Sequence, residues 1–390
     1  MTETVALYDL SPLARLMLLG IVIALGPLAW VWLRNQQRPP AQRLAALTVL
    51  TLFLTFDLVL FGAFTRLTDS GLGCPDWPGC YGSASPVGAR AEISAAQAAR
   101  PTGPVTHTKA WIEMIHRYLA TGVGVLILTL AVVSWLRRRE LPIHPAWPLL
   151  TLVWVCLQGA FGALTVTLKL QPAIVTLHLL GGLVLLALLC RQAVAYSRAW
   201  RPRVPVALPP AVRTLVVATF ALVWMQVALG GWVSTNYAVL ACTDFPTCHG
   251  RWWPPMDFAQ GFEVWRPLGY GSTGEPLTLA ALTAIHYVHR LMAYGLLPLL
   301  AVLAWRLYRA GWGRAAVWIF ALAAWQFLTG LSNVVLGWPL VAAVSHTGGA
   351  AGLVVAFTWI LCEWRPQGQS APVSQPGASR QASGVQEARG

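Results

Sequence analysis

The chain has 390 residues, of which 56% are hydrophobic and only 11% are charged. A soluble domain carries about 25% charged residues, so this composition excludes an ordinary soluble enzyme and a disordered scaffold. The net charge is +13, but most basic residues lie at the ends of apolar runs, where they act as topology signals. We therefore expect a membrane protein in contact with lipid and no nucleic-acid partner.

Nine apolar runs follow one another along the chain, each long enough for the roughly 20 residues that a spanning helix needs. The first lacks the basic start and the cleavage site of a signal peptide, so we interpret it as a retained helix. The predicted fold class is all-α integral membrane. The runs are expected at about 12–33, 44–64, 110–135, 147–167, 173–195, 212–234, 278–305, 315–337 and 340–363.

Arginine clusters in alternate connections predict the orientation. The positive-inside rule places these connections in the cytoplasm and the two long loops, about 65–109 and 235–277, outside. The N-terminus is then outside and the C-terminus inside. Residues 365–390 are rich in Pro, Ser, Gly, Gln and Ala, which predicts a disordered cytoplasmic tail. The clusters are Arg34, Arg38 and Arg43; Arg137, Arg138 and Arg139; Arg198, Arg201 and Arg203; and Arg306, Arg309 and Arg314.

An internal repeat relates the second to fifth runs to the sixth to ninth. A shift of 168 residues places GAFTRLTDSGLGCPDWPGCYG (62–82) on GGWVSTNYAVLACTDFPTCHG (230–250), and also places Gln158, Gly162, His178 and Gly181 on Gln326, Gly330, His346 and Gly349. EMIHRYLATG (113–122) matches HYVHRLMAYG (286–295) at a shift of 173. Each half spans the membrane four times, so two pseudo-symmetric four-helix bundles about an axis along the membrane normal are expected. The predicted divisions are 1–43 (extra helix and linker), 44–200, 201–364 and 365–390.

Four histidines recur as two pairs at matched depth in these helices: His116 with His178, and His289 with His346. Ionisable residues inside a membrane are costly and are candidates for function. Two imidazoles facing each other across a four-helix bundle suit axial ligation of a haem iron, whereas zinc requires three or four ligands close together. The alternative is that the histidines are packed polar groups that bond neighbouring helices.

Charged residues next to these histidines differ between the halves. Arg117 and Arg290 could each neutralise a haem propionate or extend to the lipid headgroups. Glu113 lies three residues before His116 and shares its helix face, whereas the second half has His286 at that place. Glu113 is therefore a candidate general acid/base or cation stabiliser, and the difference predicts one reactive site and one electron-transfer or structural site. A structural hydrogen bond is the alternative for Glu113.

Two cysteine pairs, Cys74 with Cys80 and Cys242 with Cys248, lie in the outer loops with the same C-x5-C spacing. Their compartment permits disulfides, and one bridge in each loop would hold that loop over its half. A redox-active dithiol is the alternative. The remaining cysteines are single residues in or near membrane helices and are interpreted as packing residues: Cys156, Cys190 and Cys362.

These strings resemble the haem A synthase family, in its cysteine-bearing bacterial type, over about residues 44–363. The resemblance implies an inner-membrane oxidoreductase with periplasmic cysteine loops that oxidises the C8 methyl of haem O to a formyl group, giving haem A for cytochrome c oxidase. It further implies that haem O binds between His116 and His178 with Glu113 near the reacting edge, and that a haem b cofactor binds between His289 and His346. The farnesyltransferase that makes haem O is an expected partner.

Two other functions compete with this interpretation. A quinol-oxidising cytochrome b-type electron carrier with two bis-His haems would explain the four histidines but would give Glu113 no role. Parallel repeats also occur in transporters. The sequence leaves open the electron acceptor and whether the chain forms a homo-oligomer.

Overall fold

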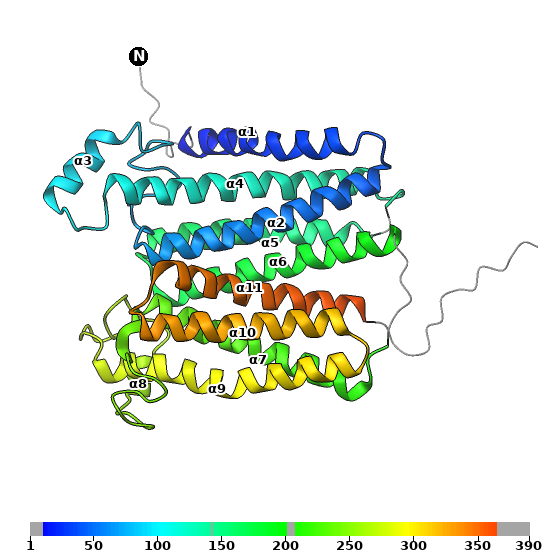
Figure 1. Ribbon diagram of the computed structural model, residues 1–390. Helices are drawn as coiled ribbons and strands as arrows, with labels where there is room; N and C mark the ends of the chain where they lie inside the picture. The colour runs from blue at the N-terminus through cyan, green and yellow to red at the C-terminus, as the bar shows by residue number, and fades with distance from the viewer. Residues whose placement is uncertain (1–10, 142, 201–206, 365–390) are drawn as a thin grey trace, which may run out of the picture.

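The computed structural model describes residues 11–141, 143–200 and 207–364, and in these ranges it is all helical apart from loops and isolated bridges. Nine helices of this part of the chain are long and apolar enough to cross a membrane, which confirms the predicted fold class and the nine expected runs. Figure 1 shows them lying side by side. They are α1 (Ser11–Arg34), α2 (Pro40–Leu67), α4 (His107–Leu136), α5 (Ala146–Thr167), α6 (Pro172–Trp200), α7 (Pro210–Thr235), α9 (Leu279–Arg309), α10 (Gly313–Val335) and α11 (Leu340–Glu363).

Two of the four helices that carry the paired histidines, α4 and α9, begin with the same chemistry. The side chain of Thr106 accepts a hydrogen bond from the backbone N–H of Lys109, and Thr278 accepts one from Ala281, both at 3.2 Å. A threonine at this position satisfies one of the N–H groups that the first turn of a helix leaves without a partner. The first turns of α4 and α9 are therefore fixed in the same way beneath their long loops.

Each half is a ring of four helices. In the first, α4 and α6 each pack against both α2 and α5; in the second, α9 and α11 each pack against both α7 and α10. The halves meet where α2 and α6 contact α11 and where α6 contacts α7. The order of neighbours is thus the same in both halves, as the repeat requires. The two-fold axis and the domain boundaries remain predictions.

Helix α1 lies outside these rings and packs against α4 (Figure 1). Its Gly20 allows a close approach, because a Cβ at that position would lie 2.4 Å from Cγ2 of Thr121 on α4. Gly122 makes the reciprocal contact with Ile23 of α1. The extra helix therefore supports the helix that carries Glu113, His116 and Arg117.

The two long loops lie at one end of the bundle, and the arginine-rich connections lie at the other (Figure 1). The loops contain three short helices that the search for apolar runs did not predict: α3 (Arg90–Ala99), η1 (Ala238–Ala241) and α8 (Phe258–Gly261). Which end faces the cytoplasm remains a prediction. The expected tail at 365–390 and two of the expected topology residues, Arg201 and Arg203, fall outside the described residues.

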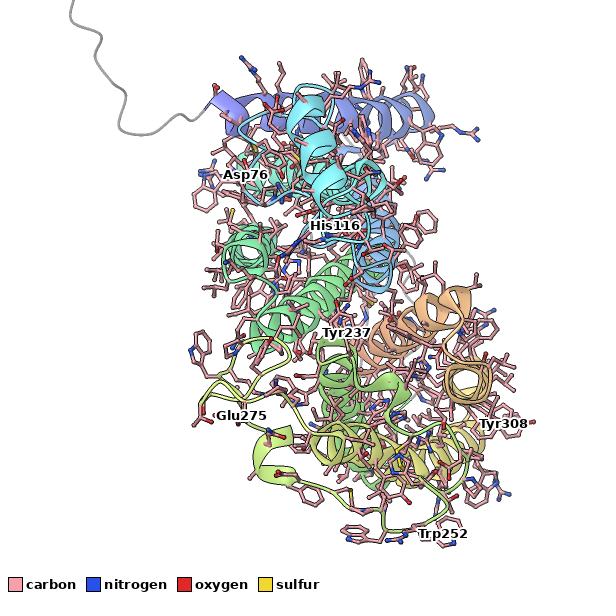
Figure 2. All side chains as sticks on the ribbon, turned by 90° about the vertical axis from the view of Figure 1, so that its left-hand side faces the viewer. Asp76, His116, Tyr237, Trp252, Glu275 and Tyr308 are labelled. Atoms are coloured by element: carbon pink, nitrogen blue, oxygen red, sulfur yellow. A yellow bond between two sulfur atoms is a disulfide. The ribbon has the colours of Figure 1, made fainter. Side chains whose placement is uncertain are left out.

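At the loop end, contacts between the halves join residues that the repeat makes equivalent. Arg66 donates to the carbonyl of Ser234, and the Tyr237 hydroxyl donates to Asp69; both pairs are 168 residues apart. The Arg66 guanidinium also lies 4.0 Å from the centre of the Tyr237 ring. Figure 2 looks onto this end and shows Tyr237 between the two halves.

Candidate functional site

The first histidine pair lies inside the N-terminal half, with each ring against a glycine of a neighbouring helix. A Cβ on Gly62 of α2 would lie 3.1 Å from Cε1 of His116 on α4, and a Cβ on Gly162 of α5 would lie 3.6 Å from Cε1 of His178 on α6. The Nδ1 atoms of both rings are buried and have no hydrogen-bond partner. Phe61 of α2 stacks on the His116 ring at 6.2 Å between centres. Buried imidazoles without partners are available as ligands.

The second pair is seated in the same way in the C-terminal half. A Cβ on Gly230 of α7 would lie 2.9 Å from Cε1 of His289, and one on Gly330 of α10 would lie 3.2 Å from Cε1 of His346. The ring centres of His289 and His346 are 6.5 Å apart. Two metal–imidazole bonds of about 2 Å each hold ring centres roughly 6 to 7 Å apart, so the spacing of these two rings, which lie edge to face at 84°, matches that of a shared iron.

Polar neighbours distinguish the second pair from the first. Thr329 Oγ1 lies 2.9 Å from Nδ1 of His346, and Gln226 Nε2 lies 3.4 Å from Nε2 of His289 and donates to the His289 carbonyl at 3.1 Å. The equivalent residues in the first half are Phe161 and Leu58, which cannot hydrogen-bond through their side chains. Sequence reasoning missed Gln226 and Thr329, because it compared only the charged residues beside the histidines, and these two lie on other helices.

Both oxygens of the Glu113 carboxylate are hydrogen-bonded beneath the first long loop. One oxygen accepts from the backbone N–H of Cys74 at 2.8 Å, and the other accepts from the Arg117 guanidinium at 2.5 Å. Glu113 is only 4% exposed. The carboxylate is thus fixed one helical turn from His116, on the side of the loop.

The equivalent residue of the second half, His286, has different bonds. Its Nε2 accepts from Nε of Arg290 at 3.1 Å, and its Nδ1 lies 3.0 Å from the Ala238 carbonyl. An imidazole that accepts through Nε2 and donates through Nδ1 is neutral. The two halves therefore have a carboxylate and a neutral ring at the same place.

The two arginines bind the carbonyl groups of their loops. Arg117 donates to the carbonyls of Asp76, Pro78 and Gly79 at 2.5–3.2 Å, and thereby fixes the first loop over α4. Arg290 does the same in the second half. These contacts, which the sequence did not reveal, leave the propionate role of both arginines a prediction. The carbonyls bound by Arg290 belong to Cys242, Asp244 and Thr247.

Each long loop is closed by a disulfide, Cys74–Cys80 in the first and Cys242–Cys248 in the second, which confirms the expected pairs. Between the two cysteines of each disulfide, an aspartate accepts hydrogen bonds from two backbone N–H groups. Asp76 accepts from residues 81 and 82, and Asp244 accepts from residues 249 and 250. Figure 2 labels Asp76 and His116, both in the first half. A redox role for these sulfur atoms stays a prediction.

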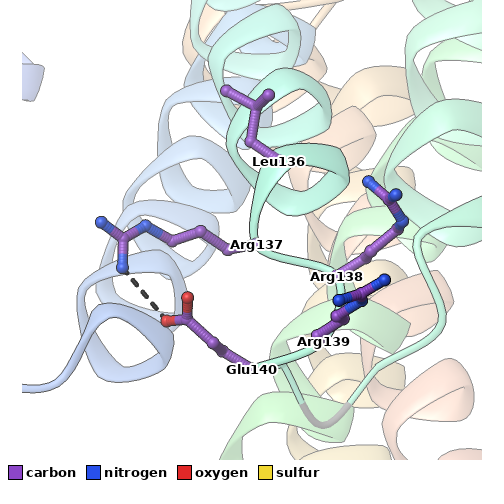
Figure 3. Close-up of a pocket in the computed structure, with 5 residues that line it drawn as sticks. All are labelled: Leu136, Arg137, Arg138, Arg139 and Glu140. Atoms are coloured by element: carbon purple, nitrogen blue, oxygen red, sulfur yellow. Dashed lines mark hydrogen bonds and ion pairs between the residues drawn. The ribbon is translucent and has the colours of Figure 1, made fainter.

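A hollow in the surface lies at the opposite end of α4 and does not belong to this site. It is lined by Leu136, Arg137, Arg138, Arg139 and Glu140, with an ion pair of 3.1 Å between Arg137 and Glu140 (Figure 3). Leu136 is 20 residues beyond His116, or about 30 Å along a helix. The hollow is formed by the arginine-rich connection alone.

Known proteins resemble this chain over most of its length. Residues 45–358 match the COX15-CtaA family model, described as "Cytochrome oxidase assembly protein". A "Heme A synthase" of Shewanella oneidensis is 41% identical over 80% of this chain and 93% of its own length. Proteins of the same name from Caulobacter vibrioides and Halalkalibacterium halodurans are 29% and 27% identical, over 78% and 74% of this chain and 92% and 86% of their own lengths. The chain therefore belongs to the COX15-CtaA family, the haem A synthases.

Proposed function

We propose that this chain oxidises the C8 methyl of haem O to the formyl group of haem A, with the N-terminal half as the substrate site and the C-terminal half as the haem b site. The names of the relatives support the reaction. The hydrogen bond between Thr329 and Nδ1 of His346, which has no counterpart in the first pair, is the observation that supports the division between the halves; Nδ1 of His289 has no partner, like those of His116 and His178. A substrate must enter and leave, whereas a cofactor stays.

The contacts of each pair agree with these roles. Hydrogen bonds to a ligand histidine fix its ring and its tautomer, and removing them typically weakens metal binding. His346 has such a bond with Thr329, and Gln226 lies beside His289. The Nδ1 atoms of His116, His178 and His289 have none. The bond at His346 thus suits the second pair to a haem that is retained, whereas neither histidine of the first pair has such a bond.

Glu113 is the proposed catalytic carboxylate. It lies one turn from His116, so it would be beside a haem O bound there, and Arg117 together with the Cys74 N–H holds it in one position. As general base it would accept a proton from water at the reacting carbon, a role that contributes typically about 10²–10⁴-fold to a rate. His286, whose Nε2 already accepts from Arg290, cannot act in the same way.

The cofactor and the surroundings complete the proposal. A haem b between His289 and His346 would transfer electrons from the substrate site to an acceptor of unidentified chemistry. The disulfide loops would lie on the periplasmic side of the bacterial inner membrane, because the arginine-rich connections favour the cytoplasm. The farnesyltransferase that makes haem O would supply the substrate within the membrane, since the substrate is hydrophobic.

Haem extraction and chromatography from cells that co-express this chain with a source of haem O test the proposal. We expect haem A or its alcohol intermediate. His116→Ala and His178→Ala should lose haem A and keep haem b, whereas His289→Ala and His346→Ala should lose haem b. Haem O alone beside the wild-type protein would contradict the reaction and favour an electron carrier. If the variants of the first pair and those of the second pair lost the same haem, this would contradict the assignment of the substrate to one half and haem b to the other.

A further inference from the structure

A carboxylate with no role in the proposed chemistry lies in the middle of α2. Asp57 is 17 residues after Pro40 and 10 residues before Leu67, so it lies about 25 Å and 15 Å from the two ends of the helix. Its side chain is exposed. Acids inside a membrane almost always face the interior of a bundle or pair with another group, and they mark functional sites. An outward-facing acid at this depth therefore requires an explanation.

The described part of this chain offers Asp57 no partner: it takes part in no hydrogen bond or ion pair there. The side chains on its own face are apolar and exposed, with Val49 at 54% and Phe53 at 60%. These three residues are four apart and form one stripe along the helix. Because α2 is apolar and long enough to span a membrane, lipid rather than water is expected around the stripe, and lipid tails offer Asp57 no hydrogen-bond partner.

The residues on the two sides of this stripe pack against different hydrophobic cores. Leu54 and Leu58 pack against the core formed with α1 and α4, whereas Phe56 packs against the core of the C-terminal half. The stripe thus faces outward between the two halves. In Figure 1, α2 crosses the front of the bundle with no other helix drawn over it. A further helix could lie along the stripe.

The repeat shows that the fold does not need an acid here. The residue equivalent to Asp57 is Met225 on α7, which is also exposed, at 49%. A thioether suits contact with lipid, whereas a carboxylate does not. The acid therefore serves something that only the N-terminal half contacts.

We propose that the stripe of Val49, Phe53 and Asp57 binds a transmembrane helix of a second membrane protein, and that this helix presents an arginine or lysine to Asp57. The basic side chain supplies the opposite charge and the hydrogen-bond donors that Asp57 lacks. Small or apolar residues on the same helix pack against Val49 and Phe53, as in other membrane helix pairs. The partner is thus a spanning helix with one base at mid-depth.

The docked helix would lie next to the first histidine pair. Asp57 is one turn from Phe61, whose ring stacks on His116. If the N-terminal half takes the substrate, a consequence that rests on the proposed function, the partner lies beside the substrate site. The docking itself does not depend on that function.

Synthetic single-span helices test this proposal on the purified full-length chain in lipid vesicles. Two labelled helices of about 23 residues, identical except for a central Arg or a central Leu, are titrated against the labelled chain, and energy transfer reports binding. We expect the wild-type chain to bind the Arg helix at least about tenfold more tightly than the Leu helix. Asp57→Asn and Asp57→Leu should abolish this preference.

Position 225 provides the matched control. Met225→Leu should leave binding unchanged, and Met225→Asp should add a second site for the Arg helix. An undiminished preference in Asp57→Asn would overturn the proposal. Loss of self-association in Asp57→Leu would also overturn it, because the stripe would then bind a second copy. Haem content and conversion of added haem O by purified Asp57→Asn should equal those of the wild type, so this result separates failed docking from failed chemistry.

Discussion

The two halves share the parts that hold the loops and differ in the parts that surround the histidines. In both, an arginine binds the carbonyls of a disulfide-closed loop, and each histidine ring lies against a glycine. Only the C-terminal half places Gln226 and Thr329 beside its histidines, and only the N-terminal half has a carboxylate, Glu113, under its loop. The common parts form the scaffold. The parts that differ therefore indicate which half retains a haem and which half carries out the oxidation.

The largest effect is expected at the carboxylate. Glu113→Gln keeps the shape and a hydrogen-bond acceptor for the Cys74 N–H but removes the base, so formation of haem A should fall by about 100-fold or more. The measurement is chromatography of extracted haem, with the haem content of the purified protein as the check on folding. His286→Gln, at the equivalent position, should reduce haem A formation much less. Equal losses at the two positions would show that both residues are structural.

The second prediction concerns the polar neighbours of His289 and His346. Gln226→Leu combined with Thr329→Val gives the C-terminal pair surroundings like those of the N-terminal pair. Haem should then dissociate from this half about 10- to 100-fold more readily, the usual effect of removing groups that orient a metal ligand. Transfer of haem to an apo-globin measures the rate.

The converse variant, Leu58→Gln, serves as the control for that experiment. It places an amide beside the first pair, where Gln226 lies in the second. Haem in the N-terminal half should then be released more slowly. If the rate of haem release were unchanged both in the double variant and in Leu58→Gln, these side chains would not be what retains the haem.

The third prediction compares two glycines. Gly230→Ala would place its Cβ 2.9 Å from the His289 ring, whereas Gly162→Ala would place its Cβ at an ordinary contact distance of 3.6 Å from His178. Overpacking of this kind costs about 1–3 kcal/mol. Gly230→Ala should therefore shift the absorption spectrum of the bound haem or prevent the haem from binding. Gly162→Ala should leave the spectrum unchanged. Two unaltered spectra would mean that the rings have room to move.

Much of this fold was predictable because the membrane imposes a strong pattern on the sequence. The expected run at 147–167 and the observed helix Ala146–Thr167 differ by one residue, since about 20 apolar residues leave few alternatives. The short helix α3 was not predicted, because it is amphipathic and the prediction rested on long apolar runs. The matched depth of the histidine pairs in the membrane stays a prediction.

The contacts of the site were less predictable. Arg117 and Arg290 bind backbone carbonyls, and the sequence does not show where a loop presents these groups. The glycines stood out as repeated residues, but only the packing shows that they make room for imidazole rings. Asp57 was visible as an acid within an apolar run, yet its outward direction depends on how α2 packs against its neighbours.

The smallest effect is expected at Asp244 in the second disulfide loop. Burial raises the pKa of this carboxyl, but hydrogen bonds from the Gly250 N–H, the Thr247 hydroxyl and the His249 N–H outweigh it and lower the pKa to about 2. A lowered pKa means that the charged form stabilises the folded loop. This contribution is complete above the ordinary value of 3.8 and is lost as the pH falls toward 2.

Amide hydrogen exchange of residues 249 and 250 measures this contribution. Their protection, corrected for the intrinsic exchange rate, should fall between pH 4 and pH 2 in the wild type. In Asp244→Asn it should already be low at pH 5 and change little, because the amide oxygen accepts hydrogen bonds less strongly than a carboxylate. Asp257→Asn, which alters the cap of α8 in the same loop, is the control and should leave both amides unchanged. The disulfide keeps the loop closed throughout, so a pH dependence that persists in Asp244→Asn would have to come from another group.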